Sequence, residues 1–329
     1  MANPASPPSK RLASAFGVTR LARLTGLDRL GFEVVGAVRP FGHVLQVSQG
    51  KGRTLAAAQW SALGEAIELS AAESPDLGSL RFGPAPQGAL WDVDGLSVAW
   101  APGRTLEGNR PCWVPAETVY CPPAGTCWLG PSIATWRSNG LGAHPTSKRA
   151  AVEHAVLELV ERDALARTLP RGWTAPAARA RLVELPPFAR ALQDQGIAAF
   201  AFDLTPPGAA LPLAGALLFD LESDVVPLTA GYACRRSWDD AVESALLEAA
   251  QSRLTEIHGA REDVLTGERE AGLTLLRSLQ GATPARARPR RERRALGAVI
   301  DAEIAVVTLR EAPFVVKAVS PTMRVSELL

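Results

Sequence analysis

Three stretches of the chain carry apolar residues at the three-to-four-residue spacing of one helical face. The pattern predicts helices from about Thr54 to Ala72, from Ser147 to Leu169 and from Ser237 to His258, the last stopped by Gly259. Apolar runs bounded by Pro, Gly or Asp lie between them and predict strands. These runs are residues 32–47 (two strands, split by Pro40 and Gly42), 197–204, 213–219, 226–234, 298–309 and 313–319.

The order of these elements favours a mixed fold class. Strands and long helices alternate irregularly, which predicts an α/β (α+β) fold rather than the regular repetition of a Rossmann sheet. The 329 residues, 47% of them hydrophobic, suffice for one large core or two fused lobes. We expect a disordered, Pro- and Ser-rich tail at residues 1–10 and one domain at residues 11–329.

Charge and cysteine content exclude several classes of protein. The formal net charge of +1 provides no overall field that would select nucleic acid, a membrane surface or an acidic substrate. No apolar run reaches the ~18 residues of a membrane span, and the N-terminus lacks the apolar segment of a secretory signal. The cysteines at positions 112, 121, 127 and 234 form no C-x-x-C pair. Reduced thiols in a cytoplasmic protein are therefore favoured over a disulfide framework or a zinc site.

A basic run, ARARPRRERR, covers residues 285–294. A flexible, solvated Arg-rich linker at residues 282–296 is the favoured interpretation. A contact for an acidic peptide or partner stays open as an alternative. The absence of aromatic residues within the run disfavours a nucleic-acid site.

The most informative feature is an internal repeat on the three predicted helices. AVEHAVLE at residues 151–158 nearly repeats as AVESALLE at residues 241–248, with six of eight positions identical. AQWSALGE at residues 58–65 is a looser copy. Each copy ends in a glutamate, and a second polar residue follows three positions later. The resulting pairs are Glu65 and Glu68, Glu158 and Glu161, and Glu248 and Gln251.

The first two pairs are carboxylates on one side of a helix, at the margin of its apolar face. Two like charges at this spacing repel unless a cation lies between them, and magnesium favours carboxylate oxygens and substrate phosphates. The repeat therefore predicts two carboxylate helices that face one metal–phosphate cluster. A merely solvated E-x-x-E surface is the alternative, and repetition in the same apolar frame argues against it.

Other polar residues suit a phosphate ligand. SQGKG at residues 48–52 precedes the first helix, where backbone N–H groups and a lysine can approach an anion. It is neither a Walker loop nor G-x-G-x-x-G, so it is weak evidence alone. SNG at residues 138–140 precedes the second helix, with an ordinary Asn-Gly turn as its alternative. Arg162 and Arg253 offer planar forks to phosphate, or else salt bridges to neighbouring acids.

Together these blocks resemble the YcaO family. The blocks are GKG at 50–52 with SALGEAIE at 61–68, SNGL at 138–141 with ELVERDA at 158–164, and EAAQSR at 248–253. They span most of the chain in the family's order and are specific only in combination. The resemblance implies a YcaO-type fold, with mixed β-sheets and long carboxylate-bearing helices around a central nucleotide cleft. It also implies an enzyme that uses ATP and Mg²⁺.

The resemblance extends to individual residues. Those that resemble the metal-facing carboxylates are Glu65, Glu68, Glu158 and Glu161. Those that resemble nucleotide contacts are Lys51, Ser138, Asn139, Arg162, Glu248, Gln251 and Arg253, of which the two arginines are also the expected catalytic residues. One departure concerns the start of the second helix, where the family usually has a glutamate. Residues 146–151 read TSKRAA here, and Glu153 lies off the acidic face, which puts one metal contact in question.

The chemistry that the resemblance implies is phosphorylation of a backbone amide oxygen in a peptide or protein substrate. A nucleophile adds to the amide carbon, and the resulting oxyanion attacks the γ-phosphate of ATP. Loss of phosphate then leaves an azoline, a thioamide or an amidine, according to the nucleophile. Magnesium and arginine contribute positioning and charge neutralisation.

Two features bear on the branch of the family. The chain ends in RVSELL at residues 324–329, without the proline-rich tail that azoline-forming members often carry. Residues 248–263 resemble members that act beside a TfuA partner in thioamidation. We therefore expect thioamide formation with a TfuA partner, with azoline formation in a ribosomally made peptide as the second choice. No added leader-binding domain is visible, so a TfuA-like or leader-binding partner is expected to present the substrate, and a homodimer is left open.

Two rival hypotheses remain. The missing glutamate near Ala150 motivates a non-catalytic YcaO homologue, acting as an accessory or scaffold in sulfur modification, such as ribosomal-protein methylthiolation. A purely structural α/β binding module with solvated acidic faces is the other. Thermal stabilisation by ATP that depends on magnesium would separate a nucleotide-binding enzyme from both, because a ligand that binds only the native state stabilises it.

Overall fold

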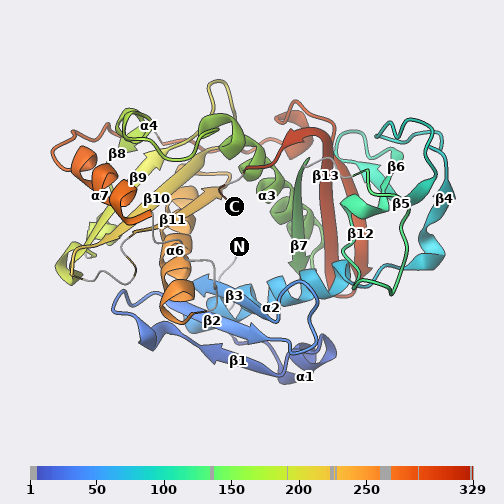
Figure 1. Ribbon diagram of the computed structural model, residues 1–329, viewed down its shortest axis with the longest axis horizontal. Coiled ribbons are helices and arrows are strands. Elements are labelled where there is room, and N and C mark those ends of the chain that lie inside the picture. The colour runs from blue at the N-terminus through green and yellow to red at the C-terminus, as the bar shows by residue number, and fades with distance from the viewer. Residues whose placement is uncertain are drawn as a thin grey trace.

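The computed structural model describes residues 6–133, 137–190, 192–222, 226, 228–259, 268–287, 289–326 and 328. Its elements form three lobes around the middle of the molecule, and each lobe is a β-sheet with one long helix packed on it (Figure 1). The long helices are those that the periodicity predicts: α2 (Leu55–Ala72), α3 (Lys148–Thr168) and α6 (Trp238–Ile257). The side chains of Thr54, Ser147 and Ser237 cap their first turns.

The first lobe is an antiparallel sheet in the order β1-β2-β3, covered by α2. Its elements are α1 (Lys10–Ala15), β1 (Arg20–Arg23), η1 (Thr25–Leu27), β2 (Glu33–Val38) and β3 (Val47–Gly52). Residues 6–10 of the expected tail contact the lobe, since Ser9 caps α1 and the Ser6 carbonyl accepts the Trp60 Nε1–H. Residues 1–5 lie outside the described residues.

The second lobe is an antiparallel sheet in the order β4-β5-β12-β13-β7, with β6 beside β5. Its strands are β4 (Arg81–Gly83), β5 (Val98–Thr105), β6 (Pro111–Pro115), β7 (Arg137–His144), β12 (Ala305–Glu311) and β13 (Phe314–Arg324). Short 3-10 turns η2 (Leu77–Ser79), η3 (Ala116–Thr118) and η5 (Leu296–Ala298) connect its parts. Because the last two strands return to the middle of this sheet, α3 packs on both β7 and β13.

The third lobe is an antiparallel sheet in the order β11-β10-β9-β8 that is buried on both faces. Its strands are β8 (Leu182–Val183), β9 (Ile197–Asp203), β10 (Leu213–Asp220) and β11 (Leu228–Cys234). Even-numbered residues of β10 such as Ala214 and Leu218 pack with the buried residues of α6. Odd-numbered ones such as Leu217 face the other way, toward α4 (Ala175–Arg181) and α7 (Glu268–Leu279). The short α5 (Pro187–Arg190) and η4 (Gln193–Gln195) precede β9.

Glycine lets each long helix approach the strand beneath it. A Cβ on Gly50 of β3 would lie 2.0 Å from the Ala62 nitrogen of α2, and one on Gly140 of β7 would lie 2.0 Å from the Ala155 oxygen of α3. At Gly231 of β11 the corresponding distance, to the Ala245 oxygen of α6, is 2.2 Å. Only glycine fits at these three positions. The three strands are therefore alike in two respects: each lies at the edge of its sheet, and each has a glycine against which a long helix packs.

Several local predictions are wrong. Residues 39–46 form a loop, so the second expected strand begins at Val47. SQGKG at 48–52 forms strand β3, and SNG at 138–140 forms strand β7, which excludes the alternative interpretation of SNG as an Asn-Gly turn. The strand expected at residues 298–309 begins only at Ala305. Strand β3 pairs with its sequence neighbour β2, and β12 with its neighbour β13, whereas β7 pairs with β13, which is distant in the sequence.

The expected Arg-rich linker is also held in place. Arg290 pairs with Asp203 at 2.9 Å, its carbonyl accepts the Trp238 N–H, and Ala285 bridges to Val183 beside β8. Glu292 accepts from the guanidinium of Arg294, so the basic run carries its own counter-charge. The described part of residues 282–296 therefore runs along the third lobe and is not a free linker.

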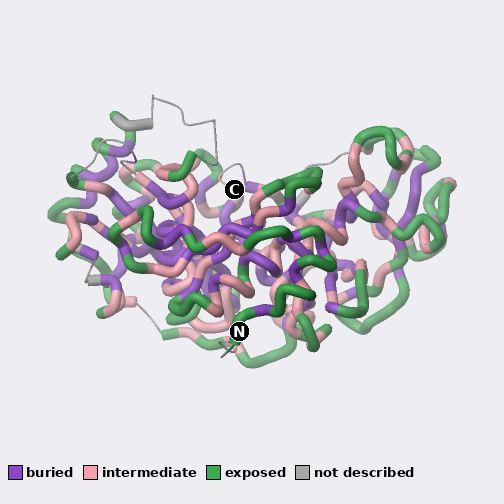
Figure 2. Tube along the Cα trace, turned by 90° about the horizontal axis from the view of Figure 1, so that it is seen from below, coloured by how far each residue is buried: buried purple, intermediate pink, exposed green. Residues whose placement is uncertain are grey.

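Buried segments run through the interior of the lobes and exposed ones along their outer surface (Figure 2). Among the described residues, no helix is both long enough and apolar enough to cross a membrane.

Candidate functional site

Each lobe places one edge strand toward the middle of the molecule: β3, β7 and β11 (Figure 1). An edge strand has backbone N–H groups that its own sheet does not use, and these need acceptors. Glutamates of the three long helices accept them. The predicted carboxylate pairs therefore accept hydrogen bonds from the backbone N–H groups of the strand edges.

The first glutamate of each helix accepts an N–H from the strand of its own lobe. Glu65 Oε2 accepts the Gln49 N–H at 2.8 Å, and Glu158 Oε2 accepts the Leu141 N–H at 2.7 Å. In the third lobe, Glu248 Oε1 accepts the Tyr232 N–H at 3.2 Å. The three helices thus repeat one contact as well as one sequence pattern.

The second glutamate reaches across to the next lobe. Glu68 of α2 accepts the Ala143 N–H of β7 at 2.7 Å, which joins the first lobe to the second. Glu161 of α3 accepts the Cys234 N–H of β11 at 2.7 Å, which joins the second lobe to the third. Both donors lie two residues after the donor of the first contact, on the same strand edge.

The contact between the third lobe and the first has a different chemistry. Position 251 on α6 corresponds to Glu68 and Glu161, but it is Gln251. The Lys51 ammonium of β3 instead donates to Glu248 Oε2 at 2.6 Å, and Thr255 Oγ1 lies 2.6 Å from Gln49 Oε1. The three inter-lobe contacts close a cycle. We call Glu65, Glu68, Glu158, Glu161 and Glu248 the carboxylate ring.

The electrostatics show that the carboxylates of the ring converge. Burial, together with the charges of Glu158 and Glu248, raises the pKa of Glu65 to about 7. Burial and the charge of Glu248 likewise raise the pKa of Glu161 to about 8. The pKa of Glu68 is raised well above its usual range, first by burial and then by Glu158. Because each group responds to carboxylates from another helix, Glu65 and Glu158 share one region.

Basic side chains lie among the glutamates of the carboxylate ring. Arg162 Nη2 lies 2.6 Å from Glu158 Oε1, and Lys51 compensates Glu248. Three further groups in this region were not predicted from the sequence: His154, Arg235 and Lys317.

Arg235 Nη1 lies 3.8 Å from Glu161 Oε2. Burial lowers the pKa of Lys317 to about 8, although Glu158 and Glu68 oppose this shift. Burial and then Arg235 lower the pKa of His154 to about 4. The position of His154, one helical turn before Glu158, was a signal available in the sequence. Lys317 and Arg235 gave no such signal.

Carboxylate oxygens in this number fit hard divalent cations. Glu65 and Glu68 have no cationic partner within ion-pair distance in the described structure. No three His, Cys, Asp or Glu side chains among the described residues are already gathered into a metal-binding group. A metal would therefore bind by drawing together carboxylates that now hold backbone N–H groups.

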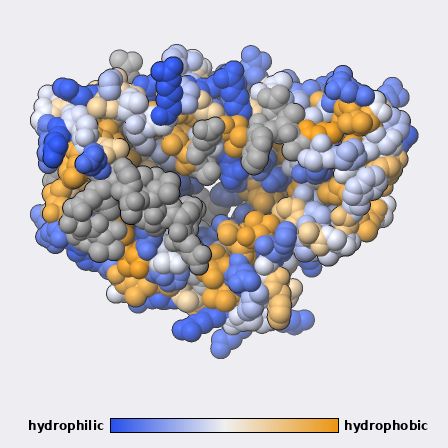
Figure 3. Space-filling view, viewed as in Figure 1, coloured by the Kyte–Doolittle hydropathy of each residue, from blue (hydrophilic) through white to orange (hydrophobic). Residues whose placement is uncertain are grey.

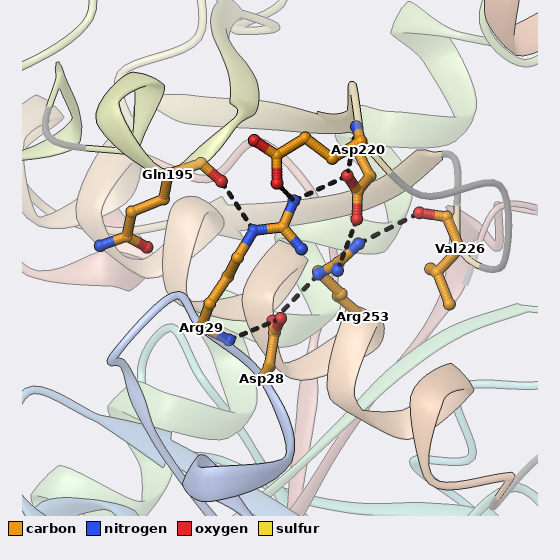
Figure 4. A network of polar contacts seen from close by, with 7 residues as sticks. Asp28, Arg29, Gln195, Asp220, Val226 and Arg253 are labelled. Atoms are coloured by element: carbon orange, nitrogen blue, oxygen red, sulfur yellow. Dashed lines mark hydrogen bonds and ion pairs between the residues drawn. The ribbon is translucent and has the colours of Figure 1, made fainter.

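The side chains of two predicted nucleotide contacts, Ser138 and Arg253, have partners within the protein, and a third contact, Asn139, lies in a strand. Ser138 is 1% exposed, and its Oγ donates to the Leu159 carbonyl of α3 at 2.6 Å, so its hydroxyl joins strand to helix. Asn139 pairs with Val319 in the sheet. Arg253 uses all three guanidinium nitrogens on groups outside the ring (Figure 4). The Arg253 guanidinium is therefore engaged with protein groups here, and its phosphate contact stays a prediction. Gln251 lies half-buried on α6, one turn after Glu248.

The face seen in Figure 1 is hollowed near its middle, with hydrophilic side chains beside the hollow (Figure 3). Grey atoms cover part of this face.

Comparisons with known proteins agree with this arrangement. The family model described as YcaO cyclodehydratase, ATP- and Mg²⁺-binding, matches residues 80–312. An uncharacterized protein of Methanothermobacter thermautotrophicus is 30% identical over 300 residues, which is 81% of this chain and 73% of that protein. An uncharacterized protein from the tfuA 3′ region of Rhizobium leguminosarum bv. trifolii is 30% identical over 276 residues, or 75% of this chain.

This chain spans 64% of the Rhizobium protein and 59% of an uncharacterized Mycobacterium tuberculosis relative. Among solved structures, the YcaO of Methanopyrus kandleri bound with AMPPCP and Mg²⁺ superimposes with a TM-score of 0.69 at 22% identity. The superposition covers 96% of this chain and 88% of that one, and it shows a common fold.

Proposed function

The chain belongs to the YcaO cyclodehydratase family, which binds ATP and Mg²⁺, and from this premise we propose that it phosphorylates a backbone amide oxygen of a peptide or protein to form a thioamide. The carboxylate ring is the observation that carries the proposal. It gathers acidic side chains from three helices at the junction of three lobes, where their charges are only partly compensated. Mg²⁺ bound to a triphosphate relieves such repulsion.

We assign the metal-facing role to Glu65, Glu68, Glu158 and Glu161. Glu65 and Glu68 carry no compensating cation in the described structure, and the raised pKa values of Glu65 and Glu161 show how unfavourable their ionised forms are without one. Bound Mg²⁺ supplies the neutralisation of phosphate charge. The carboxylates supply its position between the first and second lobes.

The cations of the ring have the complementary role. Arg162 and Lys51 each hold one carboxylate, so they can exchange that partner for a phosphate oxygen when a nucleotide enters. Glu248 and Gln251 form the wall from the third lobe. Glu248 accepts hydrogen bonds from the Lys51 ammonium and from the Tyr232 N–H, and it thereby positions the lysine side chain.

The reaction conserves oxidation state. A sulfide nucleophile adds to the amide carbon and pushes the carbonyl electron pair onto oxygen. That oxygen attacks the γ-phosphorus of ATP and ADP leaves. The carbon–oxygen bond then breaks and its electron pair departs with phosphate, while the S–H proton leaves sulfur and ends on the phosphate, so that a carbon–sulfur double bond remains. The amide, sulfide and ATP thus become a thioamide, ADP and phosphate.

The thioamide branch and the TfuA-like partner are supported by the relative from the tfuA 3′ region. They are tested together by incubating the chain with ATP, sulfide, a candidate peptide and the TfuA-like protein. We expect mass spectrometry to show replacement of oxygen by sulfur in the peptide. Loss of water without added sulfide would instead establish azoline formation and overturn the thioamide assignment.

The nucleotide site is tested by calorimetric titration with Mg²⁺–AMPPCP and by thermal unfolding. A ligand at about 100 times its Kd stabilises the native state by about 2.7 kcal/mol. We expect this stabilisation for the native chain and its loss in Glu65→Gln combined with Glu158→Gln. Glu243→Gln, which disrupts a more exposed pair with Arg53, is the matched control and should bind normally. Absence of binding by the native chain would sink the proposal.

A non-catalytic accessory role is the second candidate, and one observation favours it. The glutamate nearest the start of α3, Glu153, is held by Arg236 at 2.6 Å and does not join the ring. ATP hydrolysis above background, abolished by the double substitution above, would exclude this role. Binding without hydrolysis, in the presence of peptide and partner, would favour it.

A further inference from the structure

At the junction between the third lobe and the first, Gln251 occupies the position at which the other two helices have the glutamate that reaches the next lobe. This junction has a cluster of charges, which we call the clasp: Asp28, Arg29, Asp220 and Arg253, all with buried side chains except Arg29, which is 34% exposed (Figure 4). Asp28 and Arg29 directly follow η1 of the first lobe. Asp220 ends β10, and Arg253 lies on α6 of the third lobe.

Arg253 is the centre of the clasp. Its Nε donates to Asp28 Oδ2 at 3.0 Å, its Nη2 donates to Asp220 Oδ2 at 2.7 Å, and its Nη1 donates to the Val226 carbonyl at 3.1 Å. The side chains of Arg253, Asp28 and Asp220 are only 5%, 3% and 0% exposed. One guanidinium therefore bridges two buried carboxylates that belong to different lobes.

Arg29 completes the cluster from the first lobe. Its backbone N–H donates to Asp28 Oδ1 at 2.8 Å, and its Nη2 donates to Asp220 Oδ1 at 2.7 Å. Its Nε donates to the Gln195 carbonyl at 2.6 Å. Each aspartate thus accepts from both arginine residues, and no member can leave without exposing another buried charge.

The clasp and the carboxylate ring share helix α6. Glu248 precedes Arg253 by five residues on this helix, and Thr255 follows it by two. Glu248 contacts Lys51, and Thr255 contacts Gln49, both on β3 of the first lobe. Because a helix transmits a displacement along its length, the clasp sets the position of α6 relative to β3.

We propose that the clasp is a positioning device for the nucleotide site. Arg253, Asp28 and Asp220 hold α6 against the first lobe, so that Glu248 and Lys51 keep their places without a further carboxylate at position 251. An acidic residue there would add negative charge where a triphosphate has to bind. The inference rests on the proposed function, because nucleotide affinity is the property that the clasp controls.

The experiment compares two isosteric substitutions of buried carboxylates. Asp28→Asn weakens the clasp between lobes. Glu73→Gln weakens an equally buried ion pair with Arg39, whose members both lie in the first lobe and are 6% and 8% exposed. Both variants are expected to lose thermal stability. Only Asp28→Asn is expected to weaken Mg²⁺–AMPPCP binding, by about ten- to a hundredfold, as misplacement of binding groups does.

Arg253→Lys provides a second variant, because lysine keeps the charge but cannot hold both aspartates and the Val226 carbonyl. Its loss of affinity should not add to that of Lys51→Met, since the clasp acts through the place of Lys51. Unchanged affinity in folded Asp28→Asn would overturn the proposal, as would an equal loss in Glu73→Gln. A direct phosphate contact by Arg253 predicts undiminished affinity in Asp28→Asn and so is distinguished. Failure of the native chain to bind would instead remove the proposed function.

Discussion

The five glutamates of the carboxylate ring occupy two equivalent positions of the sequence repeat, but they differ in the charged groups that lie beside them. Glu158 and Glu248 each hold a cation at 2.6 Å, whereas Glu65 and Glu68 hold backbone N–H groups alone. The difference arises from single residues on neighbouring elements, such as Lys51 on β3. Identity of a residue within the repeat therefore does not determine its charge state, which depends on what the next lobe presents to it.

Gln251 is the one amide at a position where the other two copies of the repeat have a glutamate. Replacing it with glutamate tests whether the neutral side chain favours nucleotide binding. Gln251→Glu places a carboxylate one helical turn after Glu248, where we expect it to repel a triphosphate. We expect Mg²⁺–AMPPCP affinity to fall about tenfold, or about 1.4 kcal/mol, in calorimetric titration. Gln280→Glu, on an exposed position after α7, makes the same charge change and should have no effect. Equal affinities of the two variants would contradict the assignment.

At the scale of elements, the repeated unit is an edge strand plus the helix that packs on it. The helices bring small residues to the contact: Ala58 and Ala62 on α2, Ala151 and Ala155 on α3, Ala245 and Ala249 on α6. The strands bring glycine, and the resulting close approach lets a glutamate of short reach contact the strand edge. Backbone proximity is thus a condition for the ring as well as for the core.

Two glycine substitutions in the first lobe test this condition. Gly50→Ala has no room, since its Cβ would lie 2.0 Å from the Ala62 nitrogen, and we expect destabilisation of at least about 3 kcal/mol. Gly64→Ala on α2 meets no atom within 4 Å and should stabilise the helix by about 0.5–1 kcal/mol. Denaturant unfolding measures both changes. A tolerated Gly50→Ala would show that the strand can move away from the helix.

At the scale of the whole molecule, the lobes are held together by polar contacts around the ring and by apolar cores that extend between elements. Buried residues of α3 and β13 belong to the same core as residues of β10 and α7, which unites the second and third lobes. The first lobe joins the second through α2 and Val315 of β13. The carboxylate ring lies where all three meet, so its ionisation affects the stability of the whole chain.

The pH dependence of stability follows from the raised pKa values of the ring. A carboxyl whose pKa is higher in the folded than in the unfolded state favours folding while protonated, and this contribution is lost as pH rises through the folded value. The metal-free protein should therefore lose stability as pH rises from 6.5 to about 8, the value for Glu161; below 6.5 the lowered pKa of His154 has the opposite effect. We expect the Tm to fall by several degrees over this range.

Mg²⁺–AMPPCP should reduce this loss, because bound metal favours the ionised carboxylates. Glu65→Gln combined with Glu161→Gln should reduce it as well, by removing two of the titrating groups. Calorimetric scans across this range, with and without nucleotide, measure both effects. A Tm that rises with pH in the metal-free native chain would show that the ring is not buried as described.

Much of the site was predictable from local pattern. The three helices and the E-x-x-E pairs follow from spacing along the chain, and the N-caps confirm the boundaries. Strand β7 was not predictable, because SNGLGAH is rich in glycine and resembles a turn. Its glycines are explained by contact with α3, and its edges by β13 and by Glu158.

The ion-pair partners of Arg253 could not be predicted for a related reason. In the sequence, Arg253 follows the acidic residue Glu248 of the repeat, a position that suggested a contact with phosphate. Its partners Asp28 and Asp220 are 225 and 33 residues away, and no local spacing announces them. Buried ion pairs of this kind depend on which lobes meet, and that information is absent from the periodicity of one helix.

The amino-acid sequence by itself determined the helices, their acidic edges and the family, because these depend on residues a few positions apart and on a specific combination of motifs. The tertiary structure alone decided which carboxylates share a region, which cation lies beside each, and which groups each arginine contacts. Those outcomes depend on contacts between lobes, where burial and charge from distant segments set each pKa. The position of a glutamate on a helix follows from the local sequence. Its pKa and its hydrogen-bond partner depend on the strands that other parts of the chain place against it.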